Sequence, residues 1–359
     1  MNAPKVFWAC ITTCLLASGS QAAQLQAGSY GVSLNDQQLY LGAEVSLAQS
    51  QASLYFSNGQ ADPTTLPTVK PASIGGAVGA FNALQMGLTA TGEATLTEQS
   101  RTVGSLSRVT RTVSALQSAV DQMSVSTDNN TFKVQGLSLN GGLQVKGPFV
   151  DLLSEGGSLG LQGLSIDTAE AGRVKVSGQM SGAPYVMGDP AVTGDLKAFD
   201  GVIWEGSQVS GPMELPLYEI LAATDLNDAS WLQQRGYTIL AEDMILGANA
   251  RKVITLQSTQ VISGLQMSEG ALATFASSFG MSPDEAGAIA LSTVNATGGW
   301  GTLKITSTFK VYNNCLECNL QPPIPLPSVP EPSTWALMAL GLVGVGWTAR
   351  RQRQALAAA

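Results

Sequence analysis

Alternation of apolar and polar residues predicts that most of this chain forms β-strands. Every second residue from Leu39 to Leu47 is apolar, and the residues between them are polar or small. This is the period of a half-buried strand. The segment 54–56 is expected to pair with it, and further strands are expected over 202–204, 253–267 and 303–311. The chain is therefore predicted to be mainly β with a few helices, an α+β fold.

Two segments in the middle of the chain follow nearly the same plan. In the first, an alternating run over 132–139 leads through Asn140-Gly141 into a second run over 143–146. In the second, runs over 159–166 and 174–176 flank another turn. Because Asn-Gly between alternating runs favours a tight hairpin, we predict an antiparallel β domain. Its two related units leave a sandwich-like and a solenoid-like arrangement both open.

The period changes to that of a helix between Ile74 and Met123. Six apolar residues from Leu106 to Met123 are spaced by three and four, which predicts a helix over Thr102–Met123. It is interpreted as a helix lying on a sheet, with a partner-binding coiled coil as the alternative. Residues 74–88 have similar spacing but many glycines, so helix and strand both stay open there. Together these segments suggest a helical insertion at 73–124.

Two more helices are predicted late in the chain. Leu217–Gln234 follows two prolines and is interpreted as a helix with an interruption at Asn227-Asp228. Ser282-Pro283-Asp284-Glu285 has the residues of a capping box with proline at the first helical position. We expect that helix to run to about Asn295 and to stop at Gly298-Gly299.

The N-terminus has the pattern of a secretory signal. Lys5 precedes the apolar run Val6–Ala17, and Ser20-Gln21-Ala22 offers small residues where a signal peptidase cleaves. Residues 1–22 are therefore predicted to be removed after export. Residues 23–314 then form the exported β-rich domain, which depends on the secretion machinery and signal peptidase.

A spacer over 315–328 follows this domain and contains Cys315, Cys318 and several prolines. Prolines keep such a segment extended. In an oxidising periplasm the default expectation for Cys315 and Cys318 is a local disulfide. Cross-linking between molecules stays an alternative, whereas zinc would need two further ligands.

The C-terminal segment 329–353 has the pattern of a membrane anchor. Residues 334–349 form an uncharged apolar run, with Trp335 and Trp347 near its two ends. Such a helix satisfies its own backbone in lipid, although its length is marginal for a span. The arginines that follow place the C-terminus in the cytoplasm and the body outside; they are Arg350, Arg351 and Arg353.

Charge and composition exclude several classes of function. Lys5 and the three tail arginines carry four positive charges, so their removal takes the formal charge from −8 to −12. Nucleic-acid binding needs a basic surface, so that class is excluded. The chain has 0 histidines, which removes Ser-His-Asp and Cys-His mechanisms and histidine-ligated zinc.

The remaining candidate chemistry consists of carboxylates and aromatic rings. Three acidic pairs suit a glycosidase only if both members of a pair face one cleft: Asp225 and Asp228, Glu242 and Asp243, Asp284 and Glu285. Four aromatic residues are interpreted as buried rather than as a sugar platform: Trp204, Trp231, Trp300 and Tyr185. Gly156–Gly160 and Ser307–Lys310 match catalytic patterns but are expected to be ordinary strands. We predict no catalytic, cofactor-binding or metal-binding residue.

The tail combines a Pro-Glu-Pro motif, a short apolar helix and terminal arginines in that order. The motif residues are Val329, Pro330, Glu331, Pro332 and Ser333. This arrangement resembles the PEP-CTERM sorting signal of Gram-negative bacteria. The resemblance implies processing by an exosortase-like transpeptidase, transient residence in the inner membrane, and then a cell-surface or extracellular location. It also implies association with exopolysaccharide or biofilm.

Our first functional hypothesis is therefore a noncatalytic cell-surface or extracellular-matrix protein. The alternative is a periplasmic or surface polysaccharide hydrolase that uses carboxylates.

Overall fold

The computed structural model describes the greater part of the exported domain. The described residues are 23–26, 29–33, 41–65, 74–103, 108–128, 131–147, 156–170, 172–186, 189–212, 214–217, 219–220, 223, 229–245 and 251–313. The chain divides into two units, Met1–Cys318 and Asn319–Ala359, and every described residue belongs to the first. Within these ranges, no helix combines the length and the apolar character that crossing a membrane requires. The predicted anchor at 334–349 lies outside them.

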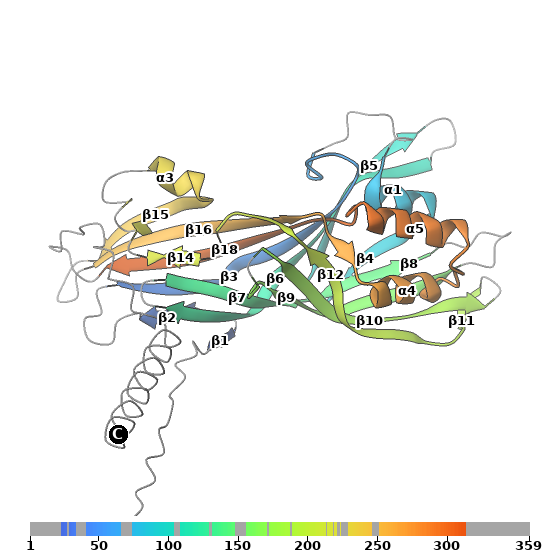
Figure 1. Cartoon of the computed structure of the whole chain (residues 1–359), viewed down its shortest axis with the longest axis horizontal. Helices are drawn as coiled ribbons and strands as arrows, with labels where there is room; N and C mark the ends of the chain where they lie inside the picture. The colour runs from blue at the N-terminus through green and yellow to red at the C-terminus, as the bar shows by residue number, and fades with distance from the viewer. Residues whose placement is uncertain are drawn as a thin grey trace, which may run out of the picture. The chain divides into compact units, whose positions relative to one another are not determined.

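Strands make up most of the described residues (Figure 1). They are β1 Ala23–Gln26, β2 Ser29–Ser33, β3 Leu41–Phe56, β4 Gly87–Thr91, β5 Thr95–Val103, β6 Arg108–Asp128, β7 Thr131–Asn140, β8 Gly142–Lys146, β9 Gly157–Asp167, β10 Val174–Val186, β11 Asp189–Thr193, β12 Lys197–Gly206, β13 Gln208–Ser210, β14 Glu214–Pro216, β15 Tyr237–Ile245, β16 Arg251–Ser263, β17 Gln266–Met267 and β18 Gly301–Asn313. The helices are α1 Gly76–Ala83, α3 Ala229–Gln234, α4 Glu269–Ser278 and α5 Ala286–Ala296.

The strands join in a closed ring of antiparallel pairs. β3 pairs with β6, β6 with β7, β7 with β9, β9 with β10, and β10 with β12. β12 and β13 then pair, in one continuous register, with β17 and β16. β16 pairs with β18, and β18 returns to β3. The pairing pathway ends where it began, so every strand of the ring has a neighbour on both sides.

Buried apolar side chains line the inside of this ring. They occupy directly opposed positions on neighbouring strands, and each is at most 8% exposed. One row consists of Met123, Leu137, Ile166, Val176, Trp204 and Met267. Another consists of Leu116, Leu54, Leu303 and Ile262. Burying a large side chain of this kind contributes roughly 1.5–3 kcal/mol, so these rows are the main core of the domain.

The ring divides into two facing halves toward the α3 end. Phe132 of β7 and Phe309 of β18 meet there edge to face, with ring centroids 5.7 Å apart. Farther along, β3 and β6 separate, and β2 pairs with the freed edge of β3 while β1 pairs with that of β6. The short N-terminal strands therefore cover edges that the ring leaves open.

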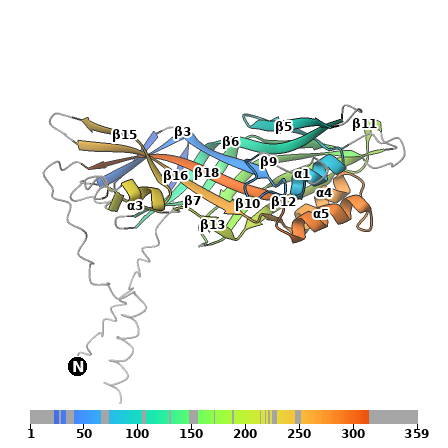
Figure 2. The same cartoon turned by 90° about the horizontal axis from the view of Figure 1, so that it is seen from above.

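Helices α1, α4 and α5 lie together toward the other end of the strands (Figures 1 and 2). α1 contacts β3 and β6, α4 contacts β9, β10 and β12, and both contact α5. Ser268 caps α4, since its hydroxyl accepts a hydrogen bond from Ala271 N at 3.3 Å. Gly157 and Gly182 lie against Ser278, so the absence of their side chains lets α4 approach the sheet closely. The helices thus bridge opposite sides of the ring.

Aromatic rings fill the space between these helices and the strands. Neighbouring rings in the series have centroids 5.4–6.3 Å apart, and all are buried. In order they are Phe56, Phe81, Trp300, Phe275 and Phe279. We call these residues the aromatic plug. Tilted and edge-to-face pairs at such distances are favourable beyond their burial.

A short segment crosses the ring at the α3 end. It links β13, which pairs with β16, to β14, which pairs with β7. We call it the strap and define it as Gly211, Pro212 and β14. Leu217 and Ile220, which follow it, are fully buried at 0% exposure. The strap therefore closes this end of the ring, as the aromatic plug closes the other.

The predicted helix over Thr102–Met123 is wrong, because this region belongs to β5 and the long strand β6. Val113 and Ala115 are buried on one face of β6, and Leu116 is buried on the other. The pairing with β7 shifts between Val120 and Gln122, which marks a β-bulge. Because β6 is buried on both faces and contains a bulge, its apolar residues recur every three or four positions, as they would in a helix. Of the proposed insertion at 73–124, only α1 is helical among the described residues.

The hairpin predicted at Asn140-Gly141 is also wrong. β7 and β8 do not pair with each other; both pair with β9, end to end. On the edge away from β9, β7 pairs with β6 whereas β8 pairs with β4. Gly141 has φ of 115° and lies against Thr91 and Ala94, so a left-handed residue is required there. The second predicted hairpin, β9 with β10, is confirmed.

One further expectation is wrong, and others are confirmed with shifted boundaries. The segment 54–56 continues the strand predicted from Leu39 rather than pairing with it, since β3 runs to Phe56. The later helix begins at Ala286, and the Glu285 carboxylate accepts from Ser282 N at 2.5 Å, half of the expected capping box. The class is mainly β and antiparallel, as predicted. Its ring is neither a pair of separate sheets, as in a sandwich, nor stacked rungs, as in a solenoid.

Candidate functional site

The sorting residues lie outside the described residues. This holds for the motif 329–333, the arginines at 350, 351 and 353, and the pair Cys315 and Cys318. Asp225 and Asp228 also lie outside them. The disulfide and the anchor therefore stay predictions.

The other acidic pairs are not brought together. Glu242 and Asp243 are exposed neighbours on β15, so their side chains leave opposite faces of the strand. Asp284 and Glu285 precede α5, which lies at the end of the strands away from β15 (Figure 1), and neither residue lines one of the three clefts described below. The described residues also contain no group of three or more metal-ligating side chains.

The predicted aromatic candidates are mostly core residues. Trp204, Trp300 and Tyr185 are at most 8% exposed. The indole N–H of Trp300 donates to Asn295 Oδ1 at 2.9 Å, whereas that of Trp204 has no partner among the described residues. Only Trp231 of this set is half-buried. Their interpretation as buried side chains is therefore confirmed for three of the four positions.

Both sequence matches to catalytic patterns are ordinary strands, as predicted. Gly156–Gly160 leads directly into β9 and is followed by no helix. On β18, Ser307 is buried and Lys310 is exposed, so the two side chains lie on opposite faces.

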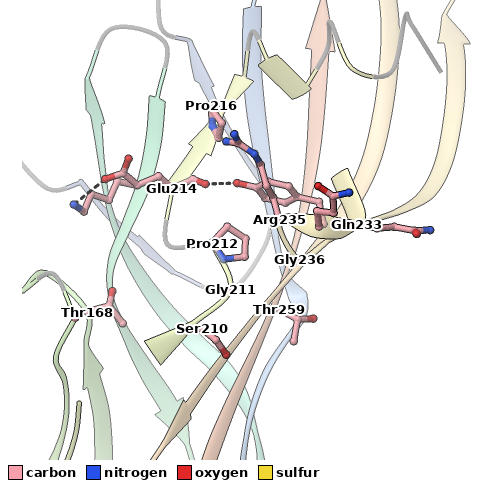
Figure 3. Close-up of a pocket in the computed structure, with 14 residues that line it drawn as sticks. Thr168, Ser210, Gly211, Pro212, Glu214, Pro216, Gln233, Arg235, Gly236 and Thr259 are labelled. Carbon is pink, nitrogen blue, oxygen red and sulfur yellow. Dashed lines mark hydrogen bonds and ion pairs between the residues drawn. The ribbon is translucent and has the colours of Figure 1, made fainter. Parts of the chain in front are cut away.

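The largest of the three clefts for which lining residues are known lies where the strap crosses the ring, and we call it the polar cleft (Figure 3). It has a volume of about 860 Å³. Its walls come from β7, the β9–β10 turn, the strap, the α3–β15 turn and β16. The lining residues are Lys133, Thr168, Gly172, Ser210, Gly211, Pro212, Glu214, Pro216, Gln233, Gln234, Arg235, Gly236, Tyr237 and Thr259.

Buried side chains hold the strap in place by hydrogen bonds to its carbonyls. Gln260 Nε2 donates to the Pro212 carbonyl at 2.7 Å. The Tyr237 hydroxyl donates to the Glu214 carbonyl, and Figure 3 shows this bond beside the ion pair of the same residue. Since Gln260 and Tyr237 are at most 5% exposed, these bonds satisfy polar groups that would otherwise be buried unpaired.

The opposite wall is fixed in the same way. Thr168 is fully buried; its main-chain N–H donates to Gln135 O and its hydroxyl to Val134 O, both at 2.8 Å. The β9–β10 turn is therefore tied to β7 next to Lys133. Buried hydrogen bonds thus fix the strap and the β9–β10 turn, while the exposed α3–β15 turn completes the lining.

Two glycines let the strap and the α3–β15 turn meet. Gly211 has φ of 89° and Gly236 has φ of 82°, values that side chains disfavour. A Cβ on Gly211 would overlap the carbonyl of Thr259, and one on Gly236 would lie 2.8 Å from Pro212 Cδ. Glycine is thus required at both positions by conformation and by space.

The cleft contains two cations and one carboxylate. Lys133 and Glu214 stand directly opposite on β7 and β14 and form an ion pair of 3.0 Å. The Arg235 guanidinium lies 4.3 Å from the centre of the Trp231 ring, a cation–π contact. Burial raises the pKa of Tyr237 well above its ordinary value, against the opposing effect of the Arg235 charge. Tyr237 therefore stays a neutral hydrogen-bond donor.

Paired carboxylates are absent from the three clefts for which lining residues are known. Glu214 is the carboxylate of the polar cleft, and two smaller clefts of about 340 and 310 Å³ contain Asp167 and Glu205 respectively. Hydrolysis by two carboxylates needs both in one cleft. None of these clefts has that arrangement.

Sequence reasoning missed the polar cleft entirely. The sequence offers a weak signal for turns here, in the glycines and prolines at Gly211-Pro212, Pro216 and Gly236. The lining residues come from positions 133 to 259, so only the ring topology brings them together.

Comparison with protein families identifies the tail. Residues 328–352 match the PEP-CTERM protein-sorting motif. The tail is a PEP-CTERM sorting signal. The match bears out the resemblance seen in the sequence, and the PEP-CTERM signal implies that the protein is exported and processed by exosortase. Neither the curated proteins nor the solved structures that were compared with the chain gave a match.

Proposed function

We propose that this chain is a noncatalytic cell-surface or extracellular-matrix protein of a Gram-negative bacterium. The secretion machinery exports it, and signal peptidase removes residues 1–22. The helix at 334–349 holds it transiently in the inner membrane until an exosortase-like transpeptidase acts near residues 329–333. The PEP-CTERM signal at 328–352 is the observation that carries this proposal.

The position of the signal supports release of an intact body. The last strand of the ring, β18, ends at Asn313, and residues 314–327 separate it from the matched region. Processing near the motif therefore removes no strand of the ring. The body left behind keeps both neighbours of β18, which are β16 and β3.

A noncatalytic role and an association with exopolysaccharide are part of the same proposal. The sequence contains 0 histidines, and each of the three clefts has a single carboxylate. These observations favour a binding or structural role over hydrolysis.

Cell fractionation in a host with exosortase tests the sorting. We expect the full chain to lose its tail and to appear at the surface or in the medium, and to accumulate unprocessed in a host without exosortase. A chain that ends at residue 328 is the matched variant, and it should leave the inner membrane in either host. Recovery of intact full-length protein in the inner membrane of the exosortase-containing host would overturn the proposal.

A further inference from the structure

The lining of the polar cleft lacks large aliphatic side chains. Most small-molecule pockets are lined mainly by hydrophobic side chains. Here the lining includes no leucine, isoleucine, valine, methionine or phenylalanine, and its apolar surfaces come from prolines, glycines and Tyr237. A ligand of this cleft therefore meets hydrogen-bonding and charged groups beside the carbon surfaces of the prolines and Tyr237.

The neutral polar groups of the cleft suit hydroxyl groups. Gln233 and Gln234 are exposed, and each side-chain amide both donates and accepts. Thr259 and Ser210 add hydroxyls from β16 and β13. A sugar hydroxyl is likewise both donor and acceptor, so this mixed set matches an oligosaccharide better than a purely acceptor or purely donor ligand.

The charges of the cleft add a preference for an acid. Lys133 is paired with Glu214, which leaves the positive charge of Arg235 without an ion pair among the described residues. This excess of positive charge stands out on a chain with a formal charge of −8. A planar guanidinium matches a carboxylate through two parallel hydrogen bonds. The geometry therefore favours a ligand that carries carboxylates.

We propose that the polar cleft binds an acidic oligosaccharide, with Arg235 on a carboxylate and the amides and hydroxyls on sugar hydroxyls. This inference rests on the proposed function, because the body must be outside the cell to meet such a polymer. The hydrogen bonds that fix the strap and Thr168 hold the cleft walls before a ligand arrives. Such pre-organisation lowers the ordering that binding requires.

Calorimetric titration of the full chain in detergent with short oligouronates tests the inference. Neutral glucan oligomers of equal length and inorganic phosphate are the comparison ligands. We expect oligouronates to bind about tenfold or more tightly than neutral oligomers, with affinity falling as salt rises. Arg235→Gln should lose that preference, whereas Arg235→Lys should keep part of it.

The chain offers a matched control for the loss of one positive charge. Lys175 pairs with Glu170 at 3.2 Å, and its side chain is 34% exposed, compared with 32% for Lys133. Lys175 does not line the cleft. Lys133→Gln should weaken oligouronate binding several-fold, because Glu214 then faces the ligand unpaired, and Lys175→Gln should leave binding unchanged.

Any one of several results would overturn the inference. They are equal affinity for neutral and acidic oligomers, unchanged binding by a folded Arg235→Gln variant, and displacement of the oligouronate by equimolar phosphate. A complete absence of binding would also overturn it. None of these results alters the fractionation pattern, so failure of the ligand assignment is distinguishable from failure of the sorting proposal.

Discussion

The two ends of the ring are closed by opposite chemistry. Toward one end, α1, α4 and α5 lie against the strands (Figure 1), and the aromatic plug packs between the helices and the strands. Toward the other, the strap crosses from β16 to β7 and uses its carbonyls as hydrogen-bond acceptors. The first closure consists of packed aromatic rings, whereas the second adds buried hydrogen bonds to the apolar residues Leu215, Leu217 and Ile220.

If the polar cleft binds the proposed oligosaccharide, this difference separates stability from ligand binding within one fold. Burial of apolar area is the dominant favourable term in folding, so the aromatic plug contributes more to stability. Hydrogen bonds contribute less in net terms, but they fix positions. The strap end therefore presents a cleft with walls that are already in place, while the plug end stabilises the ring that supports it.

Replacing one tryptophan at each end should give the largest measurable contrast. Trp300 is 1% exposed in the aromatic plug, and Trp231 is half-buried beside Arg235. We expect Trp300→Ala to lower the free energy of unfolding by about 3–5 kcal/mol, because it leaves a cavity next to Phe81 and Phe275. Trp231→Ala should cost roughly 1 kcal/mol, mainly through the cation–π contact. Urea unfolding of the full chain measures both.

Trp300→Phe sharpens the first measurement. It keeps a ring in the plug but removes the hydrogen bond to Asn295 Oδ1, so it should fall between Trp300→Ala and the unsubstituted chain. Equal losses for Trp300→Ala and Trp231→Ala would contradict the view that the apolar end supplies more of the stability.

A second contrast uses two glycines with positive φ. Gly211 in the strap has φ of 89° and a Cβ there would overlap Thr259, whereas Gly163 has φ of 59° and open space around it. Gly163→Ala should cost roughly 1–2 kcal/mol for the left-handed conformation alone. Gly211→Ala should cost at least about 1 kcal/mol more, because the strap or β16 must shift. Thermal unfolding compares them, and equal losses would mean that the strap yields easily.

Local patterns were enough to predict the strands whose two faces differ. β18 carries Leu303 and Ile305 inward and Lys304 outward, so its period was visible in the sequence. The glycines that end α5 and its capping residues acted within a few positions of the helix. Interactions that operate over short distances along the chain were therefore recoverable.

β6 shows where that reasoning fails. Both of its faces are buried, and its bulge changes the phase of the inward residues between Val120 and Met123. Ring closure requires neighbours on both edges and a filled interior, so tertiary contacts decide the outcome instead of period. Similarly, Asn140-Gly141 forms a kink because β9 runs continuously past both β7 and β8.

The polar cleft could not be predicted for a different reason. Lys133 and Glu214 carry no local signal, and they meet only because the strap pairs with β7 across the ring. The sorting tail is the opposite case, since its function depends on consecutive residues, and it was recognised from the sequence alone.

The smallest expected effect isolates the polar closure. Tyr237→Phe removes the hydroxyl that donates to the Glu214 carbonyl and changes little else. It should lower the free energy of unfolding by about 0.5–1.5 kcal/mol at neutral pH, the usual net contribution of one hydrogen bond. Urea unfolding detects a change of this size. No loss at all would mean that the carbonyl finds water and that the strap does not depend on this bond.

The pH dependence of stability tests the burial of the Tyr237 hydroxyl separately from its hydrogen bond. Burial raises the pKa of Tyr237 above its ordinary value of 10.0, so the folded protein keeps this proton where the unfolded chain loses it. The contribution of Tyr237 is therefore complete below pH 10.0 and is lost as pH rises above that value. The unsubstituted chain should lose stability over that window faster than Tyr237→Phe, which has no proton to lose. Parallel pH profiles for the two would show that the hydroxyl is solvated in the folded protein.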